Sequence, residues 1–300
     1  MIRSVFTNGL RVLCFIAFYL LFATLVFAGT DKYTAFNVKV TGKGQPMLFI
    51  PGATCSGDEW NETVTRYGSQ YQCHVFTLAG YAGVTPLASG PYLETMKKQI
   101  EQYITDQKLD NVILFGHSIG GFLSLCIASE MQTHLQKIVV VDALPFFALT
   151  FNPNAPDTFS ESKTLIMLDR YNKIDEKRRM EMQMATSKHM CADSTKWDMI
   201  TSWGMQSDRK TLVYTMAEML VCDIRKKISA IHVPVLIMAA YCKNDAEPDF
   251  NRKTVLDTFS LQYVACTTCT IHVTEDGVKH FIMYDAPDWY FKEIDNFVKN

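Results

Sequence analysis

The chain has little net charge and no cluster of one sign. Its 29 Lys and Arg side chains nearly balance 31 Asp and Glu side chains among 300 residues, which gives a formal net charge of −2 at pH 7. It contains no basic tract and no basic stretch interleaved with aromatic residues. Proteins that bind nucleic acid carry such basic patches, so the composition argues against a nucleic-acid partner.

A set of cysteines or histidines with the spacing of a metal site is also missing. Cys266 and Cys269 form a Cys-x-x-Cys motif, but a second ligand pair at a workable distance is absent. The motif precedes a strand-like run rather than a helix, so a thiolate there would lack the helix-dipole stabilisation of redox-active motifs. The sequence therefore predicts neither a metal site nor another cofactor.

The N-terminal segment differs from the rest of the chain. Arg3 and Arg11 precede an apolar stretch over residues 12–28, and small residues stand at its end. This pattern predicts a cleavable signal peptide at residues 1–28 and export to the periplasm or the cell exterior. The alternative is an uncleaved membrane anchor, because about 17 apolar residues can just span a bilayer.

Export would make disulfide bonds possible. All but one of the nine cysteines follow residue 28, and the sequence alone does not choose among their pairings. Cys126 lies within a predicted helix and is expected to be a buried apolar residue rather than half of a bridge.

Apolar runs alternate with helical patterns along most of the remaining chain. Several of these runs are continuously apolar, which is typical of parallel strands covered on both faces. Strands are predicted at residues 35–40, 47–50, 73–78, 112–115, 138–141, 233–238 and 269–273, and helices at 92–107, 251–262 and 287–299. The predicted fold class is α/β, with a mostly parallel central sheet and helices on both faces.

Residues 146–229 interrupt this pattern. No strand is evident there, and the segment is helical, charged and rich in methionine. We interpret it as a helical cap over the carboxyl edge of the sheet, between core segments 29–145 and 230–300. Flexible thioethers suit a pocket for an irregular apolar group, although they could equally fill contacts between helices.

One pentapeptide indicates chemistry: Gly116-His117-Ser118-Ile119-Gly120, which follows an apolar strand and precedes a helix. A serine hydroxyl is a weak nucleophile until a tight turn exposes it to a base and to a backbone N–H group. Glycines two residues before and after Ser118 remove the Cβ atoms that would collide in such a turn. The pattern predicts that Ser118 is an activated nucleophile.

With this motif, the chain from about residue 38 to its C-terminus resembles the α/β-hydrolases. The resemblance implies that a catalytic acid and then a histidine follow the serine. His280 lies in the loop beyond the last strand, where the family places its general base, whereas His272 alternates within that strand and is expected to be a packing or edge residue.

Two carboxylates compete for the role of the acid. Asp245 follows the strand at 233–238, which is the usual position in the family and our first choice. Asp142 follows the strand after the nucleophile, and some members of the fold take the acid from there. Asp249 and Asp276 are expected to be exposed loop residues.

The resemblance also implies two N–H donors for the oxyanion of an acyl-transfer reaction: Ile119 and, in the loop after Ile50, Ala53. That loop has Pro51-Gly52 where many relatives have His-Gly, so its hydrogen-bond support differs. His117 is expected to point away from the nucleophile and to pack structurally.

Together these features predict an exported serine hydrolase that cleaves a carboxylic ester or thioester of a partly apolar small molecule. Further stretches, at 51–57, 78–83 and 279–283, resemble exported bacterial hydrolases of esterase type. An acyltransferase or amidase would use the same residues, and a binding protein on this scaffold would need none of them.

Overall fold

A computed structural model describes residues 32–150, 159–244, 246 and 249–299 of the chain. The predicted signal peptide at residues 1–28 and the predicted acid Asp245 lie outside the described residues.

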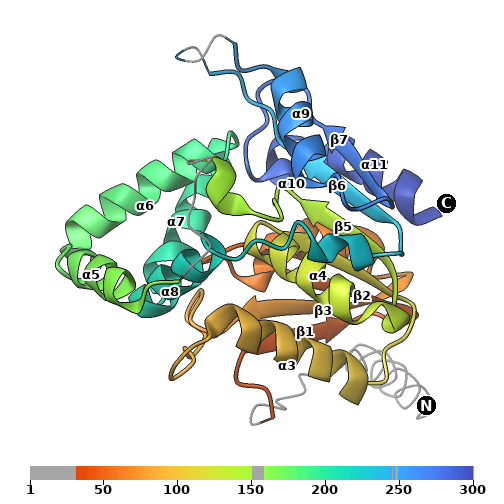
Figure 1. Cartoon of the computed structure of the whole chain (residues 1–300), viewed down its shortest axis with the longest axis horizontal. Helices are drawn as coiled ribbons and strands as arrows, with labels where there is room; N and C mark the ends of the chain where they lie inside the picture. Colours follow the sequence, from red (N-terminus) through yellow and green to blue (C-terminus); the bar gives the residue numbers. More distant parts are fainter. Residues whose placement is uncertain (1–31, 151–158, 245, 247–248, 300) are drawn as a thin grey trace, which may run out of the picture.

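A seven-stranded sheet forms the centre of the described structure (Figure 1). Its strand order is β1-β3-β2-β4-β5-β6-β7, and every neighbouring pair is parallel except β1 with β3. The strands are β1 (Phe36–Thr41), β2 (Gln45–Ile50), β3 (Tyr71–Leu78), β4 (Val112–His117), β5 (Leu135–Val141), β6 (Val235–Ala239) and β7 (Cys269–Val273). The predicted α/β fold class is confirmed, and each predicted strand is present.

Alternating side chains of the strands form two apolar cores, one on each face of the sheet. In β2, Leu48 and Ile50 belong to one core, whereas Met47 and Phe49 belong to the other. The first core is covered by α3 (Tyr92–Asp106), α4 (Ile119–Glu130) and α9 (Arg252–Gln262); the second is covered by α2 (Asn61–Tyr67), α10 (Ile282–Asp285) and α11 (Pro287–Lys299). Helices on both faces explain why the strands read as continuous apolar runs.

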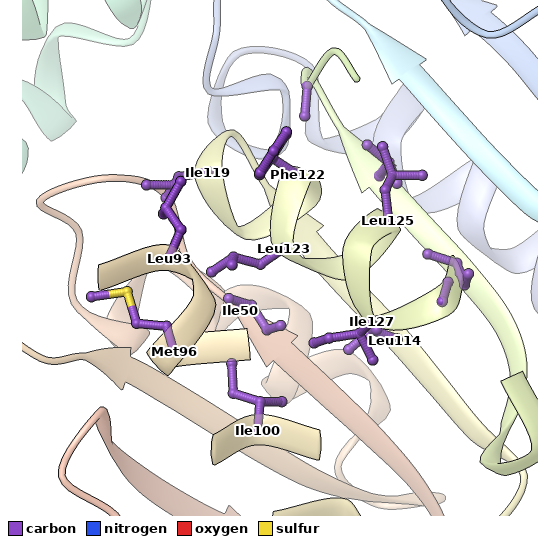
Figure 2. Packing of buried hydrophobic residues seen from close by; sticks show 14 of the residues in the cluster. Ile50, Leu93, Met96, Ile100, Leu114, Ile119, Phe122, Leu123, Leu125 and Ile127 are labelled. Atoms are coloured by element: carbon purple, nitrogen blue, oxygen red, sulfur yellow. The ribbon is translucent and has the colours of Figure 1, made fainter. Parts of the chain in front are cut away.

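The helix that follows the nucleophile is firmly packed in the first core. Figure 2 shows Leu123 of α4 close to Ile50 of β2, with Ile100 of α3 pointing toward Ile50, and Met96 of α3 belongs to the same core. All four side chains are at most 1% exposed. Because interiors are close-packed, this contact fixes the start of α4 relative to the carboxyl ends of β2 and β4.

The described chain between β5 and β6 contains only helical elements, of which α5 to α8 lie at the left of Figure 1. They are α5 (Glu161–Asn172), α6 (Glu176–Met190), α7 (Trp197–Gln206) and α8 (Arg209–Met219), with the short 3₁₀ helices η3 (Phe147–Thr150), η4 (Ser194–Lys196) and η5 (Lys227–Ala230). The other 3₁₀ helices of the described residues are η1 (Gly57–Trp60) and η2 (Gln132–His134). Within the described ranges, no helix is both long enough and apolar enough to cross a membrane.

One disulfide bond joins Cys266 to Cys269, just before β7. Cys126 is half-buried in α4 and has a free thiol. The other free thiols of the described residues belong to Cys55, Cys73, Cys191, Cys222 and Cys242.

Candidate active site

Ser118 lies on a sharp turn between β4 and α4. Its backbone has φ 54° and ψ −120°, a left-handed φ that is unusual for a residue other than glycine. Its N–H donates to the Val141 carbonyl of β5 at 3.0 Å, which fixes the turn to the neighbouring strand. Such strain at one polar residue is typical of functional sites.

The two flanking glycines permit this turn for steric reasons. A Cβ atom on Gly116 would lie 2.2 Å from the Gly120 carbonyl oxygen, and one on Gly120 would lie 2.2 Å from the Ile50 carbonyl oxygen. Both clashes are with backbone, which cannot move aside cheaply. The motif therefore brings Ser118 to the carboxyl edge of the sheet only with glycine at both positions.

His280 lies in the loop between β7 and α10, and its side chain contacts a carboxylate. Its Nδ1 atom is 2.6 Å from Oδ2 of Asp142. Because a carboxylate accepts, the proton of this hydrogen bond lies on Nδ1, and Nε2 is left to accept a proton from another group. Both side chains are about one-fifth exposed.

Asp142 follows β5 and is held in place by the end of the neighbouring strand β6. Its N–H donates to the Met238 carbonyl at 2.8 Å, and its Oδ1 accepts from the Ala240 N–H at 2.9 Å. It also has a positive φ of 47°. The carboxylate that the described residues bring to His280 is thus Asp142, whereas Asp245 lies outside them.

The loop after β2 lies beside this pair. A turn closes it, in which the Cys55 N–H donates to the Gly52 carbonyl at 3.1 Å. Ala53 in this turn and Ile119 at the first position of α4 border the same space. The first N–H groups of a helix have no acceptor within the helix, so the Ile119 N–H is suited to an anionic ligand atom.

A cavity of about 500 Å³ contains all of these groups. Ser118, Asp142 and His280 line it together with Ala53 and Ile119. The rest of its wall is largely apolar and includes Phe122, Phe147, Met190, Met216, Met219 and Phe259.

Only part of the methionine-rich segment contributes to this wall. Met190, Met216 and Met219 line the cavity, whereas Met180 and Met182 are exposed on α6. The described chain contains no group of three or more His, Cys, Asp or Glu side chains that could hold a metal ion.

The other histidine and acids considered from the sequence lie elsewhere. The Nδ1 atom of His272, on β7, is 2.6 Å from Oε2 of Glu293 on α11, outside the cavity wall. Asp249 is exposed, and Asp276 is exposed and accepts the Lys243 N–H at 2.7 Å.

The acidic residue Glu59, which contacts His117 of the cavity wall, was not predicted from the sequence. Glu59 in η1 is 1% exposed and contacts His117, which is also 1% exposed. The sequence gives no functional signal for Glu59, because its partner is 58 residues away. The neighbouring sequence shows only an acidic residue beside a tryptophan, which does not indicate a buried carboxylate.

Comparison with known proteins gives consistent matches. A model of the alpha/beta hydrolase family matches residues 47–293. A pimeloyl-(acyl-carrier protein) methyl ester esterase of Vibrio cholerae is 22% identical over 200 residues, which cover 66% of this chain and 76% of the esterase. A non-heme chloroperoxidase of Kitasatospora aureofaciens is 26% identical over 135 residues, which cover 43% of this chain and 49% of that protein.

Solved structures of similar fold are also found. An esterase from Exiguobacterium antarcticum superposes with a TM-score of 0.71 at 18% identity, covering 88% of this chain and 96% of the esterase. An enol-lactonase from Burkholderia xenovorans superposes with a TM-score of 0.69 at 12% identity, with the same coverage of 88% and 96%. At these identities the likeness concerns the fold, and the sequence relatives support hydrolase activity.

Proposed function

Because the chain belongs to the alpha/beta hydrolase family, we propose that it is a serine hydrolase that uses Ser118, His280 and Asp142. The observation that carries this proposal is the 2.6 Å contact between His280 Nδ1 and Asp142 at a cavity that Ser118 also lines. We assign the acid to Asp142 for this reason, and Asp245 is the rival that a variant can test.

The reaction begins with proton transfer from the Ser118 hydroxyl to His280 Nε2 as the oxygen attacks the substrate carbonyl. Asp142 holds the imidazole in the tautomer with Nδ1 protonated and stabilises the imidazolium that forms. The tetrahedral oxyanion then accepts hydrogen bonds from the Ala53 and Ile119 N–H groups. His280 returns its proton to the leaving oxygen or sulfur, and an acyl-enzyme remains.

Water completes the cycle. His280 takes a proton from a water molecule, the hydroxide attacks the acyl carbonyl, and Ser118 leaves with the proton that His280 returns. The products are a carboxylic acid and an alcohol or thiol. Water supplies the hydroxide for the acid product and the proton that returns to Ser118, so atoms and protons balance.

The substrate we propose is a carboxylic ester or thioester with a partly apolar acyl group. A largely apolar wall of phenylalanine and methionine side chains favours such a group, because each buried methylene contributes about 0.8 kcal/mol. Two of the similar proteins are named as esterases, which supports an ester substrate without identifying the compound.

We also propose that the protein is exported. The support is Arg3 and Arg11 before the apolar residues 12–28, together with the Cys266–Cys269 bridge, since disulfide bonds persist in oxidising compartments. Mass spectrometry of the protein isolated from its native host should find the chain starting near residue 29. An intact N-terminus in a cytoplasmic fraction would contradict export.

The test of the hydrolase function is labelling by a fluorophosphonate together with hydrolysis of nitrophenyl esters. The folded protein should form an adduct on Ser118, and the Ser118→Ala variant should lose both labelling and hydrolysis. The His280→Ala variant should lose both as well. Undiminished labelling of the His280→Ala variant would count against the proposed mechanism.

A further inference from the structure

Beneath the catalytic groups lies a buried pair of ionisable side chains that the reaction itself does not use. Glu59 and His117 are each 1% exposed, and Glu59 Oε1 is 3.1 Å from His117 Nδ1. Burying two such groups is costly, and apolar residues of similar volume would pack the same space at lower cost. Packing alone therefore does not explain why this pair is present.

Glu59 connects three segments of the active site. Its Oε2 accepts the Gly52 N–H at 3.3 Å, in the loop that carries Ala53. Its Oε1 faces His117, the residue before Ser118. Its backbone carbonyl accepts the Tyr284 hydroxyl at 3.1 Å, in α10 directly after the His280 loop.

His117 extends this connection to the general base. Its Nε2 is 3.0 Å from the His280 carbonyl oxygen, and a carbonyl can only accept, so Nε2 carries a proton. The contact between His117 Nδ1 and Glu59 Oε1 is a second hydrogen bond, in which either atom can carry the proton. Burial lowers the pKa of His117, but the charge and the hydrogen bond of Glu59 raise it, and the net effect is a raised pKa.

The packing around His117 is equally close. Its ring centroid is 4.5 Å from that of His280 and 4.9 Å from that of Phe281. A Cβ atom on Gly52 would lie 2.9 Å from His117 Nδ1, so glycine lets the oxyanion loop approach the ring. The loop has Pro51-Gly52 where many relatives have His-Gly. The side chain that accepts a hydrogen bond from this loop is Glu59, through the Gly52 N–H.

We propose that Glu59 and His117 are positioning residues that fix the oxyanion loop, the Ser118 turn and the His280 loop relative to one another. The inference rests on the proposed hydrolase function. Neither side chain transfers a proton in the reaction. Their loss should misplace catalytic groups by small distances, and a displacement of about 1 Å can lower the rate about 100-fold.

The test compares Glu59→Ala, Glu59→Gln and His117→Gln with the wild type in ester hydrolysis. We expect Glu59→Ala to lower kcat about 100-fold and to change KM by less than about threefold, because the substrate wall is intact. Glu59→Gln keeps an acceptor for the Gly52 N–H, so its kcat should be at least about tenfold higher than that of Glu59→Ala. His117→Gln should lower kcat by a similar factor to Glu59→Ala.

His74→Gln is the matched control. His74 is 3% exposed and hydrogen-bonded to the Tyr103 hydroxyl at 2.7 Å, but it lies in the first core, outside the cavity wall. It should lower the melting temperature and leave kcat unchanged. Equal kcat in Glu59→Ala and the wild type, or equal losses in the His117→Gln and His74→Gln variants, would overturn the inference.

A second measurement does not depend on activity. Downfield proton NMR should resolve the ring N–H resonances of His280 and His117, assigned with the His280→Ala and His117→Gln variants. Glu59→Gln should shift the His280 resonance, although Glu59 does not touch that ring. An unchanged His280 resonance overturns the inference, whereas loss of hydrolysis in the wild type itself would overturn only the proposed function.

Discussion

Replacement of Asp142 by asparagine tests the assignment of the acid most directly. Asp142 Oδ1 accepts the Ala240 N–H, and Oδ2 faces His280 Nδ1. In the Asp142→Asn variant the amide oxygen should keep the Ala240 N–H, because the amide nitrogen cannot accept it. The amide NH₂ then faces Nδ1 and donates to it.

This exchange inverts the tautomer of His280. With Nδ1 as the acceptor, the proton of the neutral ring moves to Nε2, which can no longer take the proton of Ser118. The same change in a serine protease triad lowers kcat about 10⁴-fold, which corresponds to about 5 kcal/mol of transition-state stabilisation. We expect a loss of this order for Asp142→Asn.

The assay is hydrolysis of a nitrophenyl ester with Asp245→Asn as the matched control. Both variants remove one negative charge from loops that follow neighbouring strands, so a general electrostatic effect would appear in both. Asp245→Asn should retain kcat within about threefold of the wild type. Loss of activity in Asp245→Asn with near-normal activity in Asp142→Asn would refute the assignment.

Three further predictions concern the turn, the pH dependence of stability and the cavity. Gly120→Ala places a Cβ atom 2.2 Å from the Ile50 carbonyl and should lower the free energy of unfolding by about 1–3 kcal/mol or more, measured by urea denaturation. Gly277→Ala, whose Cβ would meet nothing within 4 Å, should cost less, because only the strain of its positive φ of 91° remains. Burial lowers the pKa of His74 to about 4 in the folded protein, whereas a histidine of the unfolded chain has a pKa near 6.5. Between about pH 4 and pH 6.5 the unfolded chain therefore binds more protons at this residue than the folded protein does. Stability should therefore fall by about 3 kcal/mol as the pH drops from about 6.5 to about 4, and His74→Gln should flatten this part of the profile; equal slopes for both proteins would contradict the reasoning. Met219→Trp should reduce the preference for nitrophenyl butyrate over acetate by about tenfold, since two buried methylenes contribute about 0.8 kcal/mol each, and an unchanged ratio would show that Met219 does not contact the acyl group.

Much of the fold could be predicted from local patterns. The sequence places β7 and α11 at the same residues as the structure, and other strands within one or two residues at most ends. Parallel strands covered on both faces must be apolar throughout, which makes such runs easy to recognise. The order of the strands in the sheet was not predicted, because pairing depends on contacts that leave no local pattern.

Part of the candidate site could also be predicted from local patterns. Ser118 and His280 were predicted from local signals, a glycine-flanked turn and a histidine in the last loop, and both line one cavity. Glu59 was missed because its partners, Gly52, His117 and Tyr284, come from three different segments. A single acidic residue at the start of a helix carries no sign that its carboxylate is buried.

The ambiguity between the two acids has a geometric origin. β5 and β6 are parallel neighbours, so the residues that follow them meet at one edge of the sheet, and either loop can reach a histidine there. What favours Asp142 is tertiary: its N–H and its carboxylate are held by Met238 and Ala240 of the β6 edge, and its positive φ turns the chain there. The neighbouring strand thus fixes the carboxylate that faces His280. Before substrate binds, Asp142 Oδ1 already accepts the Ala240 N–H and Oδ2 already faces His280 Nδ1. The carboxylate therefore needs no reorganisation when the imidazolium forms, which is the physical advantage of this position.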